Sequence, residues 1–368
     1  MMLGGQHART GFDNLARGGA RRPGGRRVRG RSISAWGGEP ELRTLADPAP
    51  GEGELLVRVE ACGVGLTVLN CINGDLGDDP ADLPRVPGHE LVGTIVDTGP
   101  GVAPARTGER VMAYFYLFCG RCPRCLAGHE SRCERLAGFV GVDRDGGYAE
   151  LVTLPERNAI PLPPQIDPVS ATVIPDAVAT PVHVARRAGI EPGERVAVIG
   201  AGGGVGIHMV QVAAARGADV VGLEAEPRKL AFLRDDIGVG IADSSDFESV
   251  ELPEGWEQRA DVVVDLLGRP PSLRWALDHL ALDGRLVTLT TFRDSAVGIA
   301  PRELVLAQLS VLGSRYASRY ELVEAARLVA TGRVRPVVSQ RADIDDVERI
   351  HGALRTGELL GRGALVWS

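Results

Sequence analysis

The chain has 368 residues, an ordinary apolar fraction of 44% and a formal net charge of −7. This length suggests two domains, and no apolar run reaches the roughly 18 residues that a membrane-spanning helix needs. The acidic balance argues against general nucleic-acid binding. We therefore expect a cytoplasmic protein that binds a small molecule and has neither a nucleic-acid nor a membrane partner.

The amino-terminal segment differs in composition from the rest of the chain. Residues 1–31 contain eight arginines, eight glycines and one acid. Such a segment cannot bury enough apolar surface to fold, so we predict a disordered basic tail over residues 1–31. The pair Arg21-Arg22 resembles a twin-arginine signal, but no apolar segment follows it. A transit peptide of similar composition is an alternative.

Short apolar runs follow one another after the tail, each bounded by glycine, proline or acidic residues. They predict strands at residues 54–62, 91–99, 109–117 and 148–156. Because no helical pattern separates these strands, an antiparallel barrel or sandwich is expected. We predict a β-rich first domain over residues 32–177.

The pattern then changes to alternating strands and helices. Strands are predicted at residues 195–200, 218–224, 260–268 and 284–290, with helices at 205–217 and 227–238. This alternation indicates an α/β fold with a doubly wound parallel sheet, over residues 178–315. Residues 316–368, with a helix at 319–334 and a short final strand, are predicted to return to the first domain.

Four of the six cysteines lie within fifteen residues, in the pattern C-x2-C-x2-C-x7-C: Cys119, Cys122, Cys125 and Cys133. Four thiolates arranged tetrahedrally at about 2.3 Å form a closed structural zinc site, and two-residue gaps let successive sulfurs face one centre. Disulfides or a redox pair are alternatives, but no secretory signal accompanies the cysteines, and the cluster lies outside the βαβ pattern. We predict a structural zinc without an open position for catalysis.

A glycine-rich turn joins the first strand of the alternating region to its helix. Its candidate cofactor-binding residues are Gly200, Gly202, Gly203, Gly204, Val205 and Gly206. Glycines let the backbone approach a pyrophosphate, and the helix N-terminus offers free N–H groups. Glu224, eighteen positions after Gly206, falls where a ribose is bound. Its charge favours NAD(H) over NADP(H), although Arg228 could accommodate a 2′-phosphate; a tight turn without a ligand is the alternative.

Together these motifs resemble the medium-chain dehydrogenase/reductase superfamily, in its zinc-containing alcohol dehydrogenase branch. The similarity covers about residues 32–368 and includes the segments VPGHELVGTIVDTGPGV, GGYAELVTLP, GAGGGVG and LVATGRVRPVV. The resemblance implies a GroES-like catalytic domain followed by a Rossmann domain. It also implies a homodimer or a homotetramer.

The resemblance further implies a second, catalytic zinc. In the family this zinc is bound by a cysteine, by the histidine of a G-H-E motif and by a residue just before the Rossmann domain. His89 and Glu90 match G-H-E, and Asp176 falls at the third ligand. Thr67 is implied as the residue that carries the proton. Two further residues are implied near the cofactor, Thr180 beside the nicotinamide and Arg362 as a basic group.

The sequence departs from the family pattern where the cysteine ligand is expected. Gly65 occupies that position, and Val68 and Asn70 replace a frequent aspartate and a frequent histidine. Glycine has no donor atom, so the remaining nitrogen and oxygen ligands should bind zinc less tightly. Cys62 and Cys71 are interpreted as buried small residues, with entry of Cys71 into the site as the alternative.

Several of these residues also have purely structural interpretations. His89 could be a core histidine, and Asp176 could cap the following helix. His183 and His208 lie on helical patterns and are interpreted as packed or exposed rather than catalytic.

Three functional hypotheses follow. The first is a zinc-assisted dehydrogenase of secondary alcohols or polyols that transfers a hydride to a nicotinamide. The second is a reductase without catalytic zinc that acts on an activated C=C or C=N bond. The third is a cofactor-binding protein that has lost turnover.

Overall fold

The computed structural model describes residues 27–291 and 295–367, so most of the predicted basic tail, residues 1–26, lies outside the described residues. The chain divides into two compact units, and each is described by itself. The first consists of Met1–Pro164, Arg341–Gly352 and Ala364–Ser368; the second consists of Gln165–Gln340 and Ala353–Gly363. Among the described residues, no helix combines the length and the apolar character that crossing a membrane requires.

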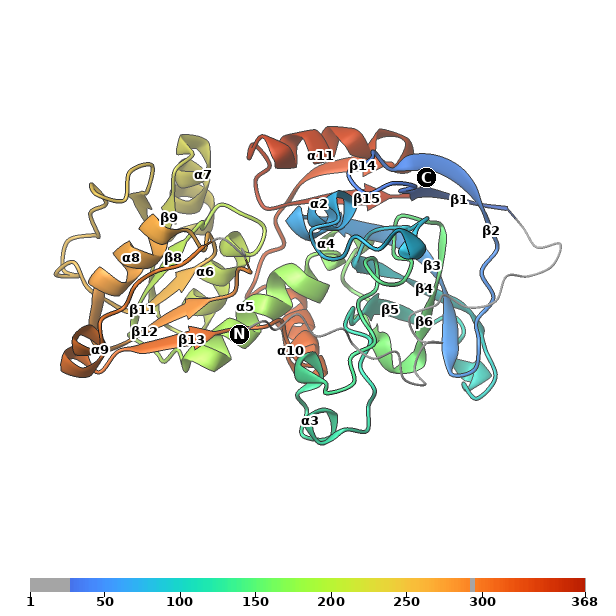
Figure 1. Ribbon diagram of the computed structural model, residues 1–368, viewed down its shortest axis with the longest axis horizontal. Coiled ribbons are helices and arrows are strands. Elements are labelled where there is room, and N and C mark those ends of the chain that lie inside the picture. The colour runs from blue at the N-terminus through green and yellow to red at the C-terminus, as the bar shows by residue number, and fades with distance from the viewer. Residues whose placement is uncertain (1–26, 292–294, 368) are drawn as a thin grey trace. The chain divides into compact units, whose positions relative to one another are not determined.

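The first unit is built around a mixed sheet with the strand order β14-β15-β3-β4-β5-β7, in which β6 pairs with β3 (Figure 1). β3 pairs with β4 and β6, and β5 with β4 and β7, all antiparallel. The strands are β3 (Glu54–Val64), β4 (Glu90–Thr98), β5 (Arg110–Ala113), β6 (Leu151–Pro155), β7 (Ala159–Pro161), β14 (Val338–Asp343) and β15 (Arg362–Val366). The expected β-rich architecture is therefore confirmed, and the final strand, β15, lies in this sheet between β14 and β3.

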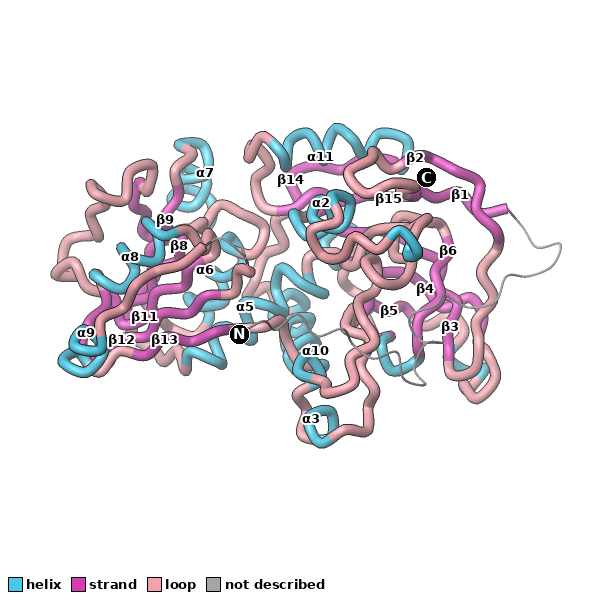
Figure 2. Tube along the Cα trace, viewed as in Figure 1, coloured by secondary structure: helices cyan, strands magenta, loops and turns pink. Residues whose placement is uncertain are grey.

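A separate two-stranded sheet and short helices complete this unit. β1 (Arg27–Ser32) pairs antiparallel with β2 (Glu41–Ala46). The short helices are α2 (Leu66–Asn73), α3 (Pro123–Leu126) and α11 (Val347–Arg355), whose last residues belong to the second unit. Figure 2 shows these helices in cyan, with α3 at the end of a pink loop.

The strand β1 corrects the predicted extent of the disordered tail. Val28 is buried, and the guanidinium of Arg31 donates hydrogen bonds to the carbonyl oxygens of Ile344 and Pro40. Arg29 pairs with Glu150 at 3.1 Å. The prediction is wrong for residues 27–31, because these arginines find carbonyl and carboxylate partners far away in the sequence.

The second unit contains a sheet with the strand order β10-β9-β8-β11-β12-β13 (Figure 1), in which every neighbouring pair is parallel. The strands are β8 (Arg195–Ile199), β9 (Asp219–Glu224), β10 (Gly240–Asp243), β11 (Ala260–Asp265), β12 (Leu280–Thr288) and β13 (Ser310–Gly313). This order, 3-2-1-4-5-6 in sequence, is that of a Rossmann sheet, so the predicted α/β fold with a doubly wound sheet is confirmed.

The helices of this unit connect and flank the strands. They are α4 (Pro168–Ala171), α5 (Ala179–Ala188), α6 (Gly206–Ala215), α7 (Pro227–Phe232), α8 (Pro270–Asp278), α9 (Pro301–Ala307) and α10 (Arg319–Ala330). Part of the core lies between α8 and the strands, where Ala197, Val221, Val263 and Leu273 pack with Trp275. Burial of these apolar side chains stabilises the sheet, including β8, the strand that leads into the glycine-rich turn.

Unit boundaries and some elements differ from those expected from the sequence. The first unit ends at Pro164 rather than at residue 177, and α10 belongs to the second unit rather than to the returning segment. The strand β5 stops at Ala113, because the aromatic segment that follows is held by the buried amide of Asn158, which donates to the carbonyls of Tyr114 and Tyr116.

Candidate metal and dinucleotide sites

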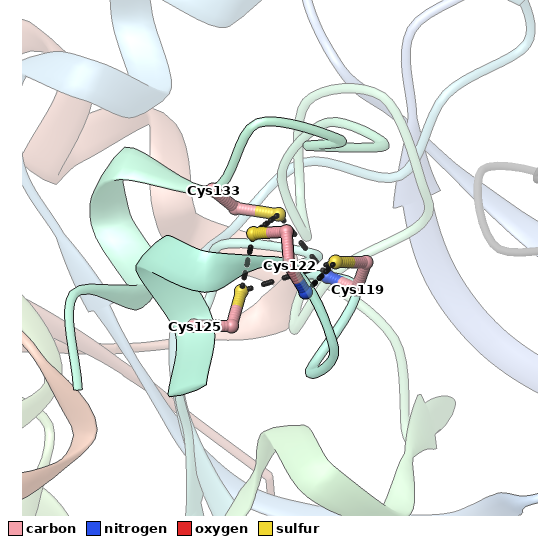
Figure 3. A group of neighbouring side chains, drawn as sticks. All are labelled: Cys119, Cys122, Cys125 and Cys133. Carbon is pink, nitrogen blue, oxygen red and sulfur yellow. Dashed lines mark hydrogen bonds between the residues drawn. The ribbon is translucent and has the colours of Figure 1, made fainter. Parts of the chain in front are cut away.

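The four clustered cysteines converge on one point in the first unit. Figure 3 shows their sulfurs facing one another, with Cys125 on α3 and the others on the adjoining loops. The Sγ–Sγ distances are 3.5 Å for Cys122–Cys125 and 3.9 Å for both Cys119–Cys125 and Cys122–Cys133. The predicted cluster of Cys119, Cys122, Cys125 and Cys133 is therefore assembled as a group.

The dimensions of this cluster fit a zinc ion. Four sulfurs at about 2.3 Å from a tetrahedral centre lie about 3.8 Å apart, close to the distances observed. Backbone N–H groups of Cys119, Cys122 and Arg135 also point at sulfurs, each at 3.3 Å. Such N–H donors stabilise thiolates, so the four sulfurs are arranged as a structural zinc site requires.

The remaining two cysteines lie in the core of the first unit. Cys62 is fully buried, and burial together with the nearby Glu90 carboxylate raises the pKa of its thiol. Burial raises the pKa of Cys71 to about 12, and its Sγ lies 3.2 Å from the carbonyl oxygen of Gly141. Both are protonated thiols at neutral pH, which agrees with their interpretation as buried small residues.

The glycine-rich turn lies in the second unit, between β8 and α6. Gly200 has a φ of +79°, which favours glycine. A Cβ on Gly206 would collide with the carbonyl of Gly200 and with Ala201, so the helix can begin this close to the strand only with glycine. Because glycines have no side chains, the backbone of the turn is uncovered at the carboxyl end of β8. In a sheet of this topology a dinucleotide is expected to bind there.

Glu224, the last residue of β9, is held beside the turn. Its Oε2 accepts a hydrogen bond from the N–H of Gly202 at 2.9 Å. Its Oε1 accepts from the N–H groups of Ala225 and Glu226 at 2.9 and 3.3 Å. Three backbone donors thus fix a carboxylate next to the glycines, at the position where a ribose hydroxyl could be bound.

The basic residues that follow Glu224 have partners of their own. Arg228 is exposed and pairs with Glu226 at 3.0 Å. Lys229 is buried, and its ammonium donates to the carbonyl of Gly357 at 2.6 Å. The alternative role of Arg228 as a phosphate-binding residue would require it to exchange this ion pair for the ligand.

Asp176, Thr180 and Arg362 form one cluster within the second unit. Asp176 lies in a π-helical turn, Ile174–Val178, directly before α5; such turns are frequent at functional sites. Its Oδ1 accepts from the hydroxyl of Thr180 at 2.8 Å, and its Oδ2 accepts from the guanidinium of Arg362 at 3.1 Å. Arg362 also lies against Gly204, where a Cβ would collide with the guanidinium.

Three further predicted residues, His89, Glu90 and Thr67, lie in the first unit with Gly65. His89 is buried, and its ring meets the edge of Phe115 at a centroid distance of 4.7 Å. Glu90 begins β4 and is buried beside Gly63. A Cβ added at Gly63 would overlap the Glu90 carboxylate. Gly65 is the N-cap of α2, and Thr67 is half-buried in the first turn of that helix.

Comparison with known proteins places this chain among dehydrogenases. A family model described as the alcohol dehydrogenase GroES-like domain matches residues 51–164, and one described as a zinc-binding dehydrogenase matches residues 204–331. An alcohol dehydrogenase of Geobacillus stearothermophilus is 32% identical over 88% of this chain and 94% of its own length. The chain belongs to the medium-chain dehydrogenase/reductase superfamily, in the zinc-type alcohol dehydrogenase-like branch.

Two more relatives illustrate the range of this superfamily. A thermostable alcohol dehydrogenase from Pyrobaculum aerophilum, solved with cobalt and zinc, is 30% identical, with a TM-score of 0.83 over 93% of this chain and 100% of that one. An acryloyl-coenzyme A reductase of Metallosphaera sedula is 28% identical over 88% of this chain and 95% of its own length. This chain is accordingly an alcohol dehydrogenase-like oxidoreductase with a cysteine cluster suited to a structural zinc.

In this dehydrogenase, the residues predicted for a catalytic zinc form a reduced donor set. Gly65 supplies no ligand atom. In the second unit, both carboxylate oxygens of Asp176 already accept hydrogen bonds, one of them from the cationic Arg362. A metal would have to compete with this ion pair and would lack a thiolate, so this donor set is poorly suited to a second zinc.

His208, near the dehydrogenase's glycine-rich turn, makes contacts that the sequence does not predict. His208 was interpreted as packed or exposed; it is fully buried, and its Nδ1 lies 2.7 Å from the carbonyl oxygen of Gly204. The four-residue spacing between Gly204 and His208 on a helix could have suggested this bond. The second partner of the ring, the N–H of Val337, is 129 positions away and has no signal in the sequence.

Proposed function

We propose that this protein is an NAD-dependent oxidoreductase that transfers a hydride between the nicotinamide and a secondary alcohol or ketone. The observation that carries the cofactor assignment is the Glu224 carboxylate, which three backbone N–H groups hold beside the glycine-rich turn. Glu224 would accept hydrogen bonds from ribose hydroxyls and repel a 2′-phosphate. When bound, the nicotinamide supplies or accepts a hydride at C4.

The residues of this chain would orient the reactants and move the proton. Arg362 would neutralise dinucleotide phosphate near Gly204, and Thr180 would lie beside the nicotinamide. The hydroxyl of Thr67, at the start of α2, would take the proton from the alcohol or return it to the carbonyl. His89 and Glu90 are the other candidates for proton transfer, and both are buried in the first unit.

A second candidate function is favoured by Gly65. Without the thiolate ligand, a reaction that needs little Lewis-acid assistance becomes more suitable than alcohol oxidation. Reduction of an activated C=C or C=N bond is of this kind, and a similar curated protein is an acryloyl-coenzyme A reductase. In this version Thr67, His89 or a water would protonate the carbon or nitrogen that does not receive the hydride.

A single set of measurements separates the two candidates. The purified protein is assayed with NADH against ketones and activated enones, and with NAD against secondary alcohols, before and after chelation. The first candidate predicts ketone and alcohol turnover, and zinc assistance would further require about two zinc ions per wild-type chain and one in His89→Ala. Enone turnover that survives chelation, with one zinc per chain in both proteins, would instead establish the second candidate.

We also propose that the protein assembles as a homodimer through the edge of its parallel sheet. β13 is the last strand in the sheet order, and the apolar side chain of Val311 on it is 43% exposed. Leu282, Val305 and Leu306, on the neighbouring β12 and α9, are 75%, 71% and 63% exposed. An exposed edge strand with apolar neighbours can pair with a second copy, and a homotetramer would require a further surface.

A further inference from the structure

The ring of His208 joins two segments of the second unit that are far apart in the sequence. A carbonyl oxygen can only accept, so the Nδ1 that faces Gly204 must carry the proton. The Nε2 lies 3.1 Å from the N–H of Val337 and must therefore be the acceptor. The partners fix one neutral tautomer, with one bond to the glycine-rich turn and one to the segment before β14.

A backbone hydrogen bond connects Val337 in turn to Arg362. The carbonyl of Val337 accepts from the N–H of Arg362 at 3.0 Å, and the N–H of Gly361 donates to the carbonyl of Gly202 at 3.2 Å. The guanidinium of Arg362 then reaches Asp176 and lies against Gly204. The turn and the start of β15 are thus connected twice, once directly and once through the imidazole.

The two hydrogen bonds of the His208 ring go beyond what filling the core requires. A buried phenyl ring of similar size would fill the same space, but it would leave the N–H of Val337 and the carbonyl of Gly204 without their partner. Both groups adjoin the residues that our proposed function assigns to the dinucleotide. A displacement of Val337 would be passed to Arg362 through the backbone bond between them.

We propose that His208 is a positioning residue for the dinucleotide: through Val337 it holds Arg362 over the glycine-rich turn. This inference rests on the proposed function, because it takes a nicotinamide dinucleotide as the ligand of that turn. His208 itself does not contact the cofactor. It acts by keeping the guanidinium where a phosphate would be bound, so its removal should weaken dinucleotide affinity more than it alters turnover at saturating cofactor.

The experiment titrates NADH, and in parallel NADPH, into the full-length protein and follows binding by calorimetry. In His208→Asn the short amide can still donate to Gly204 but cannot reach Val337. We expect the dinucleotide Kd to rise roughly five- to tenfold, the loss of about one buried hydrogen bond. In His208→Gln the longer side chain can replace Nε2 as acceptor, and we expect a Kd within about twofold of wild type.

Two controls separate positioning from general damage. His279, the C-cap of α8, makes the same kind of bond from Nδ1 to the carbonyl of Trp275 at 2.8 Å, but among the described residues its ring donates to no second segment. His279→Asn should leave the Kd unchanged. In an Arg362→Gln background, His208→Asn should add less than about twofold, because both changes remove the same interaction.

The possible outcomes distinguish failure of this inference from failure of the proposed function. An unchanged Kd in a folded His208→Asn protein, equal losses in the Asn and Gln variants, or full additivity with Arg362→Gln would each overturn the inference while leaving the proposed function intact. A wild-type protein that binds neither dinucleotide would contradict the proposed function and with it this inference. Circular dichroism of every variant verifies that the fold is retained.

Discussion

The carboxylate of Asp176 accepts a hydrogen bond from the guanidinium of Arg362 at 3.1 Å, and the side chains are only 13% and 7% exposed. Removing one partner of a buried pair leaves the other charge without compensation, which costs about 3 kcal/mol. Asp176→Asn should therefore lower the melting temperature of the protein by roughly 4 °C. Differential scanning calorimetry measures this shift.

An exposed ion pair provides the matched control for this substitution. Arg234 and Asp235 pair at 2.7 Å, but their side chains are 59% and 58% exposed. Solvent and salt screen such a pair, so Asp235→Asn should leave the melting temperature nearly unchanged. Equal shifts in the two variants would contradict a special role for the buried pair.

Zinc content tests the cysteine cluster. Cys122→Ser should lose one zinc per chain, because a hydroxyl is a poor replacement for a thiolate in a tetrahedral site. Cys71→Ser serves as the control, since this thiol is buried against the carbonyl of Gly141 and lies outside the cluster. Metal analysis of the purified variants gives the count. Retention of zinc in Cys122→Ser would refute the assignment.

Elements that rest on local sequence patterns were predictable, whereas contacts between distant segments were not. The strands β8 and β9, the helix α6 and the cysteine cluster were predictable because each rests on a local pattern: apolar runs, glycine spacing and two-residue gaps between thiols. The assignment of residues 27–31 to a disordered tail failed, because Arg29 and Arg31 gain stability from partners more than a hundred positions away. The bond from Val337 to His208 was beyond sequence reasoning for the same reason.

Acid sensitivity is expected from the same histidine. Burial lowers the pKa of His208 to about 4, and the nearby Arg362 cation adds to this effect. The unfolded chain binds a proton at this residue near pH 6.5 and the folded chain only near pH 4. Stability is therefore undiminished above about pH 6.5 and falls as the pH drops from there to about 4, by up to about 3 kcal/mol.

The variant His208→Asn checks this assignment, because asparagine does not titrate. Its unfolding free energy, compared with that of wild type in urea between pH 4 and pH 7, should fall less steeply as the medium is acidified. The zinc content must be equal at each pH, because acid also releases metal from thiolates. Parallel profiles for the two proteins would assign the acid sensitivity to other groups.

The proposed homodimer rests on the exposed edge of the parallel sheet. Val311→Asp places a charge on β13 and should shift the protein from dimer to monomer, since burying an unpaired carboxylate at an interface is costly. Val323→Asp is the control, because Val323 is similarly exposed, at 52%, but lies on α10. Light scattering coupled to size exclusion measures the mass. A wild-type monomer would disprove the proposed dimer.

The proposed preference for NAD rests on the carboxylate of Glu224, which β9 places beside the glycine-rich turn. Glu224→Gln keeps an oxygen that can accept from Gly202 but removes the negative charge, so repulsion of a 2′-phosphate should decrease. We expect the ratio of the NADPH and NADH dissociation constants to fall about tenfold, a change of about 1.4 kcal/mol. Glu248→Gln, which removes an exposed charge of the same unit, should leave this ratio unchanged. Because Arg228 already pairs with Glu226, we assign the proposed NAD preference to Glu224, and an unchanged ratio in Glu224→Gln would contradict this proposal.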